Sequence, residues 1–302
     1  MNLISNLPGI QPEIPVQPFA AQAFNHAGIE AMILRLDLIH PVISGNKWFK
    51  LKLYLQDALA QHYQHVVTLG GAYSNHIVAT AYACRHFGLG CTGIIRGERP
   101  ARLSPSLSAA EQYGMRLTFI TRDQYRRRTY PPVEEAYFIE EGGYGPRGAQ
   151  GASDITDLID DFESFTHIVC AAGTGTMLAG LASKTKAHQR VEGISVLKNN
   201  FALEPCVKRL LPPGFDAGRI TIHQDYHFGG YAKHPPALIN YMKRLYSENH
   251  IPTDIVYTAK LMYGVQDLAT QDYFRKGNRL LLIHSGGLQG NLSLPAGSLP
   301  FS

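Results

Sequence analysis

Lys47 is the residue whose setting most favours chemistry. It follows the flexible pair Gly45-Asn46 and precedes the apolar residues Trp48 and Phe49. Removing a lysine amine from water lowers its pKa and makes the neutral amine available. Such an amine condenses with an aldehyde to form a Schiff base. A surface lysine that opens a helix is the commoner explanation for a single lysine, so the hypothesis depends on residues elsewhere in the chain.

A strand, a glycine loop and a helix are predicted between residues 167 and 186. The apolar run 167–171 is typical of a buried strand, and residues 177–186 predict a helix. The loop between them, called the Gly-Thr loop below, is Gly173-Thr174-Gly175-Thr176. Glycines let backbone N–H groups approach an anion, and the helix N-terminus adds partial positive charge. A tight turn without a ligand would use similar residues, but phosphate is the ligand that these groups suit.

The composition indicates a globular protein without a nucleic-acid partner. Of 302 residues, 45% are hydrophobic and 17% are charged, and the formal net charge is +4. The one dense basic run, 126–128, is interpreted as a solvated face, and there is no nucleic-acid motif. No secretory signal and no apolar run long enough to cross a membrane is present, so a cytoplasmic location is expected.

The cysteines favour neither a disulfide framework nor a metal site. No pair has Cys-x-x-Cys spacing, and each lies in an apolar stretch. Buried free thiols are therefore expected, with no metal, at Cys84, Cys91, Cys170 and Cys206.

Strands and helices alternate along most of the chain, which predicts an α/β fold with parallel sheets covered by helices. One series spans about 48–160 and a second resumes near 165, while residues 1–27 are Pro-rich and irregular. We expect a large domain of 1–47 plus 160–302, a smaller domain of 48–159, and a ligand site between them. The predicted strands are 31–36, 65–69, 91–95, 117–120, 137–139, 167–171, 192–197, 220–223 and 280–283. The predicted helices are 48–61, 76–87, 106–113, 149–161, 177–186, 201–210, 235–249 and 260–274.

A reactive amine together with a phosphate loop suggests a phosphorylated aldehyde, which is pyridoxal 5'-phosphate. Several blocks resemble, in order, those of the D-cysteine desulfhydrase and 1-aminocyclopropane-1-carboxylate deaminase family. These are fold-type-II pyridoxal phosphate enzymes related to the tryptophan synthase β chain, with two open twisted parallel-sheet domains. The blocks are 44–47 (Ser-Gly-Asn-Lys), 70–76 (Gly-Gly-Ala-Tyr-Ser-Asn-His), 141–143 (Glu-Gly-Gly), the Gly-Thr loop, 254–258 (Asp-Ile-Val-Tyr-Thr) and 284–287 (His-Ser-Gly-Gly).

The resemblance implies roles for individual residues. Lys47 would carry the cofactor as a Schiff base and then remove the Cα proton of the substrate. Asn75 would bind the phenolic oxygen of the cofactor, and Ser74 would bind the substrate carboxylate. Tyr257 would lie against the pyridine ring, and Tyr231 matches a second active-site tyrosine. The phosphate would be bound by Gly173, Thr174, Gly175 and Thr176.

Some of these assignments have simpler alternatives. Either tyrosine could be a half-buried core residue. His76 could merely cap or pack its helix, and the role of Ser285 is left open.

Thr258 matches the family position whose side chain faces the pyridine nitrogen, where the cyclopropane deaminases have glutamate. A carboxylate there keeps the nitrogen protonated and the ring a strong electron sink, which ring opening needs. A hydroxyl suffices for loss of a good leaving group, so Thr258 favours β-elimination. His76 also stands where the deaminases have glutamine. Ile255 stands for the usual proline of both branches and is compatible with the same turn. Segment 77–80 (Ile-Val-Ala-Thr) stands where the desulfhydrases have a more polar run with an arginine, so the resemblance leaves the substrate open.

The resemblance therefore implies β-elimination of D-cysteine to pyruvate, hydrogen sulfide and ammonia. Deamination of 1-aminocyclopropane-1-carboxylate to 2-oxobutyrate and ammonia is the alternative within the family. A non-catalytic protein that binds pyridoxal phosphate or another phosphate is the alternative of another class, although it would not need a desolvated Lys47. The partners implied are a small amino-acid substrate and a second copy of the chain in a homodimer.

Overall fold

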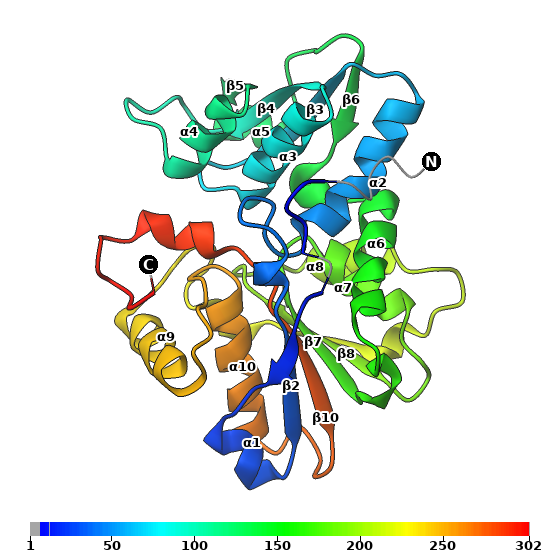
Figure 1. The fold of residues 1–302 in the computed structure, drawn as a ribbon, viewed down its shortest axis with the longest axis vertical. Coiled ribbons are helices and arrows are strands. Elements are labelled where there is room, and N and C mark those ends of the chain that lie inside the picture. Colours follow the sequence, from blue (N-terminus) through cyan, green and yellow to red (C-terminus); the bar gives the residue numbers. More distant parts are fainter. Residues whose placement is uncertain (1–6, 12, 302) are drawn as a thin grey trace.

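The computed structural model describes residues 7–11 and 13–301. Two sheets lie one above the other with helices around them (Figure 1). The strands are β1 (Val16–Pro18), β2 (Glu30–Leu34), β3 (His65–Gly70), β4 (Gly90–Arg96), β5 (Met115–Ile120), β6 (Ala136–Ile139), β7 (His167–Ala172), β8 (Arg190–Ser195), β9 (Ile220–His223) and β10 (Arg279–Ile283). The helices are α1 (Gln22–Ala27), α2 (Lys47–Ala60), α3 (Asn75–His86), α4 (Pro105–Gln112), α5 (Arg122–Arg127), α6 (Pro146–Ser153), α7 (Thr176–Ser183), α8 (Leu203–Lys208), α9 (Pro236–Asn249) and α10 (Thr258–Thr270).

The larger sheet has the strand order β1-β2-β10-β7-β8-β9. Its strands are parallel except β1, which pairs antiparallel with β2 so that Val16 lies opposite Leu34. The central strands are buried on both faces, as in β10, where Leu280 to Ile283 are fully buried. The segment expected to be irregular thus contributes an edge strand, and Pro18 at its end suits an edge position.

The smaller sheet has the order β5-β4-β3-β6, and all its strands are parallel. The predicted α/β fold with two parallel-sheet units is confirmed. All four strands lie between residues 65 and 139, within the predicted smaller domain. The exact boundaries at 47/48 and 159/160 stay a prediction.

Three helical segments differ from the sequence prediction. Helix α1 lies within residues 1–27, which were expected to be irregular. The helix expected over 149–161 begins earlier, as α6, and ends at Ser153, where a 3₁₀ turn over Asp154–Leu158 replaces it. A Cβ atom on Gly151 would lie 2.0 Å from the carbonyl oxygen of Phe49, so glycine is what lets α6 lie against α2. Helix α5 was not predicted, although Thr121 and Gln124 form a capping box at its start.

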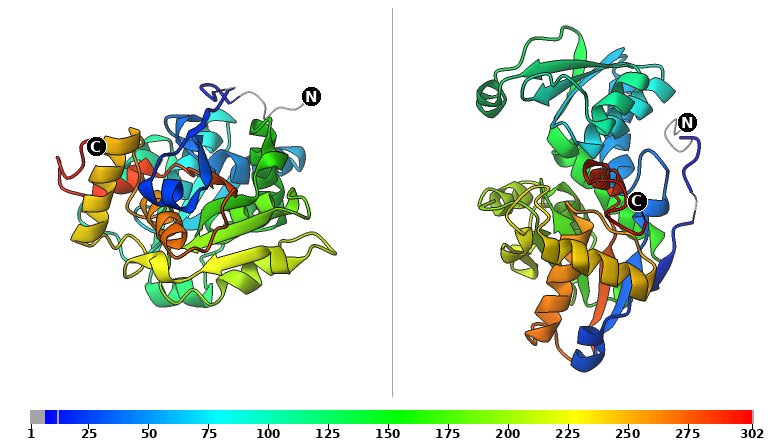
Figure 2. Two further views of the ribbon diagram at one scale, coloured as in Figure 1. Left: turned by 90° about the horizontal axis from the view of Figure 1, so that it is seen from below. Right: turned by 90° about the vertical axis from the view of Figure 1, so that its left-hand side faces the viewer.

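The carboxyl ends of the strands meet at the space between the two sheets (Figures 1 and 2). From β3 the chain enters the loop 71–74, from β7 the Gly-Thr loop, and from β10 the segment 284–287. Parallel sheets bind ligands at the carboxyl ends of their strands, so these loops define where a site should lie.

Two further expectations were tested. All four cysteines are free, and three are buried, but Cys206 is partly exposed. Between residues 7 and 301, residue 12 aside, no helix is long and apolar enough to cross a membrane.

Candidate active site

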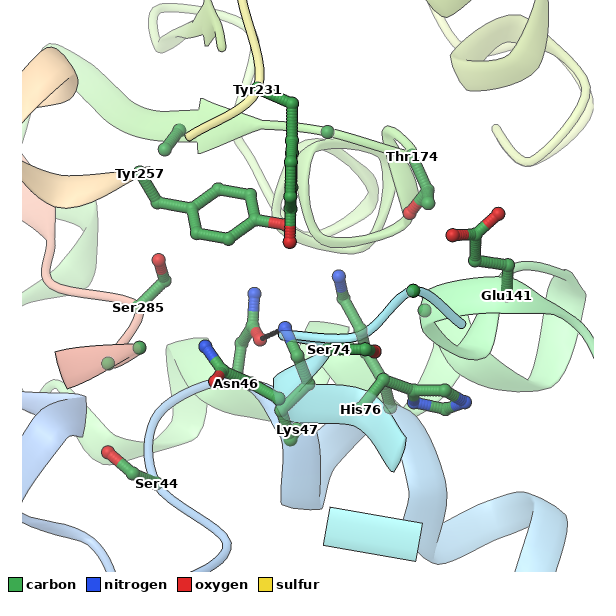
Figure 3. Close-up of a pocket in the computed structure, with 18 of the residues that line it drawn as sticks. Ser44, Asn46, Lys47, Ser74, His76, Glu141, Thr174, Tyr231, Tyr257 and Ser285 are labelled. Carbon is green, nitrogen blue, oxygen red and sulfur yellow. Dashed lines mark hydrogen bonds between the residues drawn. The ribbon is translucent and has the colours of Figure 1, made fainter. Parts of the chain in front are cut away.

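A cavity of about 250 Å³, called the inner pocket below, lies where these loops meet (Figure 3). It is lined from both sheets and brings together most of the predicted site residues. Those lining it are Lys47, Ser74, Asn75, Gly173, Thr174, Tyr231 and Tyr257.

The loop before α2 places Lys47 at the inner pocket. Gly45 has φ +70°, and a Cβ atom there would lie 1.8 Å from the carbonyl oxygen of Ser285. Only glycine allows the two segments to approach this closely, and the N–H of Asn46 then donates to Ser285 O at 3.2 Å. Lys47 follows as the first residue of α2, where it is fixed against the end of β10.

The amine of Lys47 is suited to nucleophilic chemistry. Its Nζ donates to Asn46 Oδ1 at 2.9 Å and lies 5.7 Å from the ring centroid of Tyr257 (Figure 3). Removal from bulk water lowers the pKa of Lys47 to about 8, and the charge of Asp254 opposes this shift. A substantial fraction of the amine is therefore neutral near pH 8.

The Gly-Thr loop has the geometry of an anion site. Gly175 is left-handed, with φ +83°, and a Cβ atom there would lie 2.6 Å from the Val207 side chain. The loop leads into α7, whose first N–H groups have no acceptor within the helix. Thr176 is fully buried, and its hydroxyl lies 2.9 Å from that of Thr174, which lines the inner pocket.

Lys50 also lines the inner pocket, and the sequence analysis missed it. The residue is 6% exposed, and among the described residues no carboxylate pairs with its amine. Burial and the neighbouring charge of Lys47 lower the pKa of Lys50 well below its ordinary value. Residues three apart share a helix face, so the Lys47-x-x-Lys50 spacing was the available indication. A buried amine beside the Gly-Thr loop fits a phosphate group.

The start of α3 carries two buried polar atoms that find no partner among the described residues, Asn75 Oδ1 and His76 Nδ1. The hydroxyl of Thr68 donates to Ile139 O at 2.8 Å, so it must accept from His76 Nε2 at 2.9 Å. His76 Nδ1 is then a free acceptor at the inner pocket. Burial and the two neighbouring lysines lower the pKa of His76 to about 3, so the ring is neutral. Unpartnered polar groups of this kind indicate a ligand site.

Ser74 is the N-cap of α3, and its hydroxyl accepts from the N–H of Ile77 at 3.4 Å. Because a helix N-terminus favours an anion, this position suits a substrate carboxylate, as expected for Ser74.

The two tyrosines form the wall opposite α3. Tyr231 and Tyr257 have ring centroids 6.4 Å apart at 80°, and their hydroxyls point toward each other (Figure 3). A Cβ atom on Gly173 would lie 3.4 Å from Tyr257 Cε1, so this ring lies against the Gly-Thr loop. Burial raises the pKa of both phenols, which keeps them protonated as hydrogen-bond donors.

Thr258, whose place at the pyridine nitrogen stays a prediction, makes its hydrogen bonds within its own turn. It is fully buried and does not line the inner pocket. Its hydroxyl donates to Asp254 Oδ1 and accepts from the Asp254 N–H, both at 2.7 Å. The Asp254 carboxylate also accepts the N–H groups of Val256, Tyr257 and Thr258. Thr258 therefore completes the turn that begins α10.

Ser285 lines the inner pocket instead, at the end opposite Thr174 (Figure 3). Two charged residues, Arg96 at the end of β4 and Glu141 after β6, line it as well and were not assigned to the site from the sequence. Both follow the rule that ligand sites form at the carboxyl ends of strands, and Glu141 also begins the block 141–143 of the family resemblance, which gave it no role.

Comparisons with known proteins agree with this geometry. The family described as "Pyridoxal-phosphate dependent enzyme" matches residues 10–286. A Thermotoga maritima protein, provisionally named a 1-aminocyclopropane-1-carboxylate deaminase, is 32% identical, with 91% of this chain and 94% of that protein covered. D-cysteine desulfhydrase of Klebsiella pneumoniae subsp. pneumoniae is 28% identical, with 87% and 88% covered. The solved structure of an ACC deaminase homologue is 26% identical, with a TM-score of 0.77 and 96% and 94% covered.

The amine, the Gly-Thr loop and the unpartnered polar groups of the inner pocket all fit pyridoxal 5'-phosphate. The chain belongs to the pyridoxal-phosphate dependent enzymes, in the family that contains the D-cysteine desulfhydrases and the 1-aminocyclopropane-1-carboxylate deaminases.

Proposed function

We propose that this enzyme catalyses the β-elimination of D-cysteine, which gives pyruvate, hydrogen sulfide and ammonia. When bound, the cofactor supplies an electron sink for the charge left at Cα after proton removal. The proposal concerns what the residues of this chain contribute around it.

The observation that carries the proposal is the position of carboxylates around the inner pocket. Glu141 is its only lining carboxylate among the described residues, and it lies at the end near Thr174 (Figure 3). Ser285, at the other end, offers a hydroxyl. The carboxylate of Asp254 is enclosed by donors of its own turn and does not line the pocket. A hydroxyl cannot hold a ring nitrogen protonated as firmly as a carboxylate, and β-elimination of a thiolate needs only the weaker sink.

Lys47 would first hold the cofactor and then act as the base that takes the Cα proton. Its lowered pKa suits a group that must be neutral before it accepts a proton near neutral pH. Ser74 and the N-terminus of α3 would bind the substrate carboxylate, and Asn75 would bind the phenolic oxygen of the cofactor. Tyr257 and Tyr231 would cover the ring and limit access of water.

The Gly-Thr loop would bind the phosphate through Gly173, Thr174, Gly175 and Thr176, and Lys50 would neutralise part of its charge. Thr258 would act only through Asp254, by holding that carboxylate in place.

Deamination of 1-aminocyclopropane-1-carboxylate is the second candidate, because a relative provisionally given that name matches over 91% of this chain. Lys47, Ser74 and the two tyrosines would serve that reaction equally well.

The test is product analysis with purified holoenzyme. D-cysteine, L-cysteine, D-serine, β-chloro-D-alanine and 1-aminocyclopropane-1-carboxylate would be supplied separately, with Lys47→Ala as the control. We expect pyruvate and sulfide from D-cysteine, lost in the variant. Production of 2-oxobutyrate from the cyclopropane substrate would identify the deaminase branch instead. A yellow protein that is inert with every substrate would contradict the elimination proposal.

A further inference from the structure

A basic recess adjoins the inner pocket on the side of the smaller sheet. This space of about 590 Å³, called the arginine recess below, is lined by Arg96, Arg122, Arg126, Tyr73, Tyr125 and Tyr231 among others. Arg96 and Tyr231 line both spaces, so a ligand in the inner pocket can extend into the recess. Of the residues that the structure describes, no acidic one lines the recess.

The arginines of the recess lack counter-charges. Within the part of the chain that the structure describes, Arg96, Arg122 and Arg126 form no ion pair. The next two arginines along the chain are paired, Arg127 with Asp123 at 3.0 Å and Arg128 with Glu140 at 2.6 Å. Among the described residues, the arginines that line the recess are therefore unpaired, and their two paired neighbours do not line it.

Arg122 and Arg126 also lie one turn apart on α5, where like charges repel each other. Such a face is stabilised when an anion binds to it. Burial, and after it the charge of Glu141, raises the pKa of the Tyr125 phenol. Glu141 lines the inner pocket and forms no ion pair with these arginines among the described residues.

Arg96 lies at the junction of the two spaces. Its guanidinium carbon is 5.4 Å from the ring centroid of Tyr125, and a Cβ atom on Gly71 would lie 3.4 Å from its terminal nitrogen. The guanidinium is thus placed by an aromatic face and by the loop that leads to Ser74. A planar guanidinium binds carboxylate, phosphate or sulfonate groups through two parallel hydrogen bonds.

The sizes of the two spaces indicate which part of a substrate reaches the recess. The inner pocket, about 250 Å³, must hold the cofactor and the α-amino acid portion, and its volume is below the range of about 300–1,000 Å³ that is usual for ligand pockets. A large β-substituent has room only in the adjoining recess. Tyr73 and Tyr231, 41% and 40% exposed, form aromatic walls there.

We propose that the preferred substrates carry a second anionic group on the β-substituent, which Arg96 binds while Arg122 and Arg126 attract it. This rests on the proposed function, because the β-substituent is the group that leaves. With O-phosphoserine, Lys47 takes the Cα proton, the Cβ–O bond breaks with its electron pair going to phosphate, and water converts the remainder to pyruvate and ammonia.

The first experiment compares kcat/KM for O-phosphoserine and serine, each as both enantiomers, in the wild-type holoenzyme and in variants. The kcat/KM for O-phosphoserine is divided by that for serine in each protein. The two substrates differ in their leaving group, but this difference is the same in every variant, so a change in the ratio reports the substitution. Arg96→Gln should lower the ratio by about 10- to 100-fold, the range for a lost charge-assisted hydrogen bond. Arg122→Gln with Arg126→Gln should lower it by about 3- to 10-fold, and added salt should abolish that smaller effect.

Arg116→Gln is the matched control, because it removes an exposed arginine of the same sheet, on β5, that does not line the recess. Its ratio should equal that of the wild type. A ratio unchanged in Arg96→Gln, while D-cysteine is still turned over, would overturn this inference and leave the proposed function standing.

A binding measurement separates the two proposals further. Borohydride reduction would fix the cofactor on Lys47, fill the phosphate site and stop turnover. Titration calorimetry with O-phospho-D-serine and D-serine then reports the recess alone. Tighter binding of the phosphorylated compound, lost in Arg96→Gln, would support the anion site even if no substrate is turned over. Equal binding of the two compounds would contradict it.

Discussion

The starts of α2 and α10 each bury a lysine in the field of Asp254, yet the two lysines differ in what surrounds them. The pKa of both Lys47 and Lys260 is lowered to about 8, mainly by desolvation. Lys260 is fully buried and donates to Gly230 O at 2.7 Å and to Val196 O at 3.5 Å. Lys47 donates to the side chain of Asn46 and faces the inner pocket. A lowered pKa therefore does not identify a nucleophile, whereas its partners and its access to a ligand do.

The comparison is tested most strongly by removing each amine in turn. Lys47→Ala should abolish covalent attachment of the cofactor, and loss of the base should lower turnover by about 10²- to 10⁴-fold. Borohydride reduction followed by mass spectrometry measures attachment directly. Lys260→Met should still be labelled at Lys47. Labelling of Lys260 in the Lys47→Ala protein would show that desolvation alone is enough for reactivity.

Lys50 extends the comparison to a third buried amine. Among the described residues no carbonyl accepts from it, and it is expected to bind an anion. Lys50→Met should weaken cofactor binding by about 10- to 100-fold, since a hydrogen bond to a charged group is worth about 1.5–3 kcal/mol. Equilibrium dialysis of the apoprotein with pyridoxal phosphate gives the affinity. Lys52→Met is the matched control, because Lys52 is on the same helix and pairs with Asp154 at 2.6 Å. Equal losses in both variants would show a general charge effect.

The lowered pKa of Lys47 has a direct consequence for cofactor uptake. Only the neutral amine attacks the aldehyde, so the attachment rate should rise about tenfold per pH unit below 8 and level off above it. A lysine with the ordinary pKa of about 10.4 would continue to accelerate up to pH 10. Stopped-flow absorbance of the apoprotein mixed with pyridoxal phosphate follows the reaction. A rate still rising steeply above pH 9 would contradict the desolvation of Lys47.

Lys260 should act as a positioning residue for Tyr231. Its amine holds the carbonyl of Gly230, the residue directly before Tyr231. Lys260→Met leaves that buried acceptor without a donor, which should lower the free energy of unfolding by about 1–3 kcal/mol. KM should rise by about 3- to 10-fold with attachment at Lys47 intact. Lys243→Met, at an exposed position of α9, controls for the loss of charge. A KM equal to the wild-type value would show that Lys260 does not position Tyr231.

The local motifs of the site could be predicted because each depends on a few neighbouring residues. Gly45 is required by its contact with Ser285, and Gly175 by its left-handed conformation against Val207. Both place their functional neighbours through backbone geometry alone. The parallel sheets followed from strands whose residues are apolar on both faces.

The remaining site residues depend on tertiary structure. Arg96 and Glu141 come from different strand ends, and only the assembled smaller sheet brings both to the inner pocket. Thr258 is expected at the pyridine nitrogen from its place in a motif, and its hydrogen bonds within its own turn could not be predicted from that motif. At the start of α10 the buried carboxylate of Asp254 needs donors, and the Thr258 hydroxyl supplies one.

The charge of Asp254 acts on both Lys47 and Lys260. Thr258→Val, a change at the residue that holds this carboxylate, is therefore the test with the smallest expected effect. The substitution keeps the shape but removes one donor to the carboxylate and one acceptor for the Asp254 N–H. It should lower the free energy of unfolding by about 1–3 kcal/mol. Three N–H donors still hold Asp254, so the absorbance maximum of the holoenzyme and kcat should stay within about twofold. Ser285→Ala should move the absorbance maximum without this loss of stability, because Ser285 lines the inner pocket. If Thr258→Val moved the absorbance maximum and Ser285→Ala did not, the hydroxyl in contact with the cofactor ring would be that of Thr258. The turn around Asp254 would then contact the ligand directly.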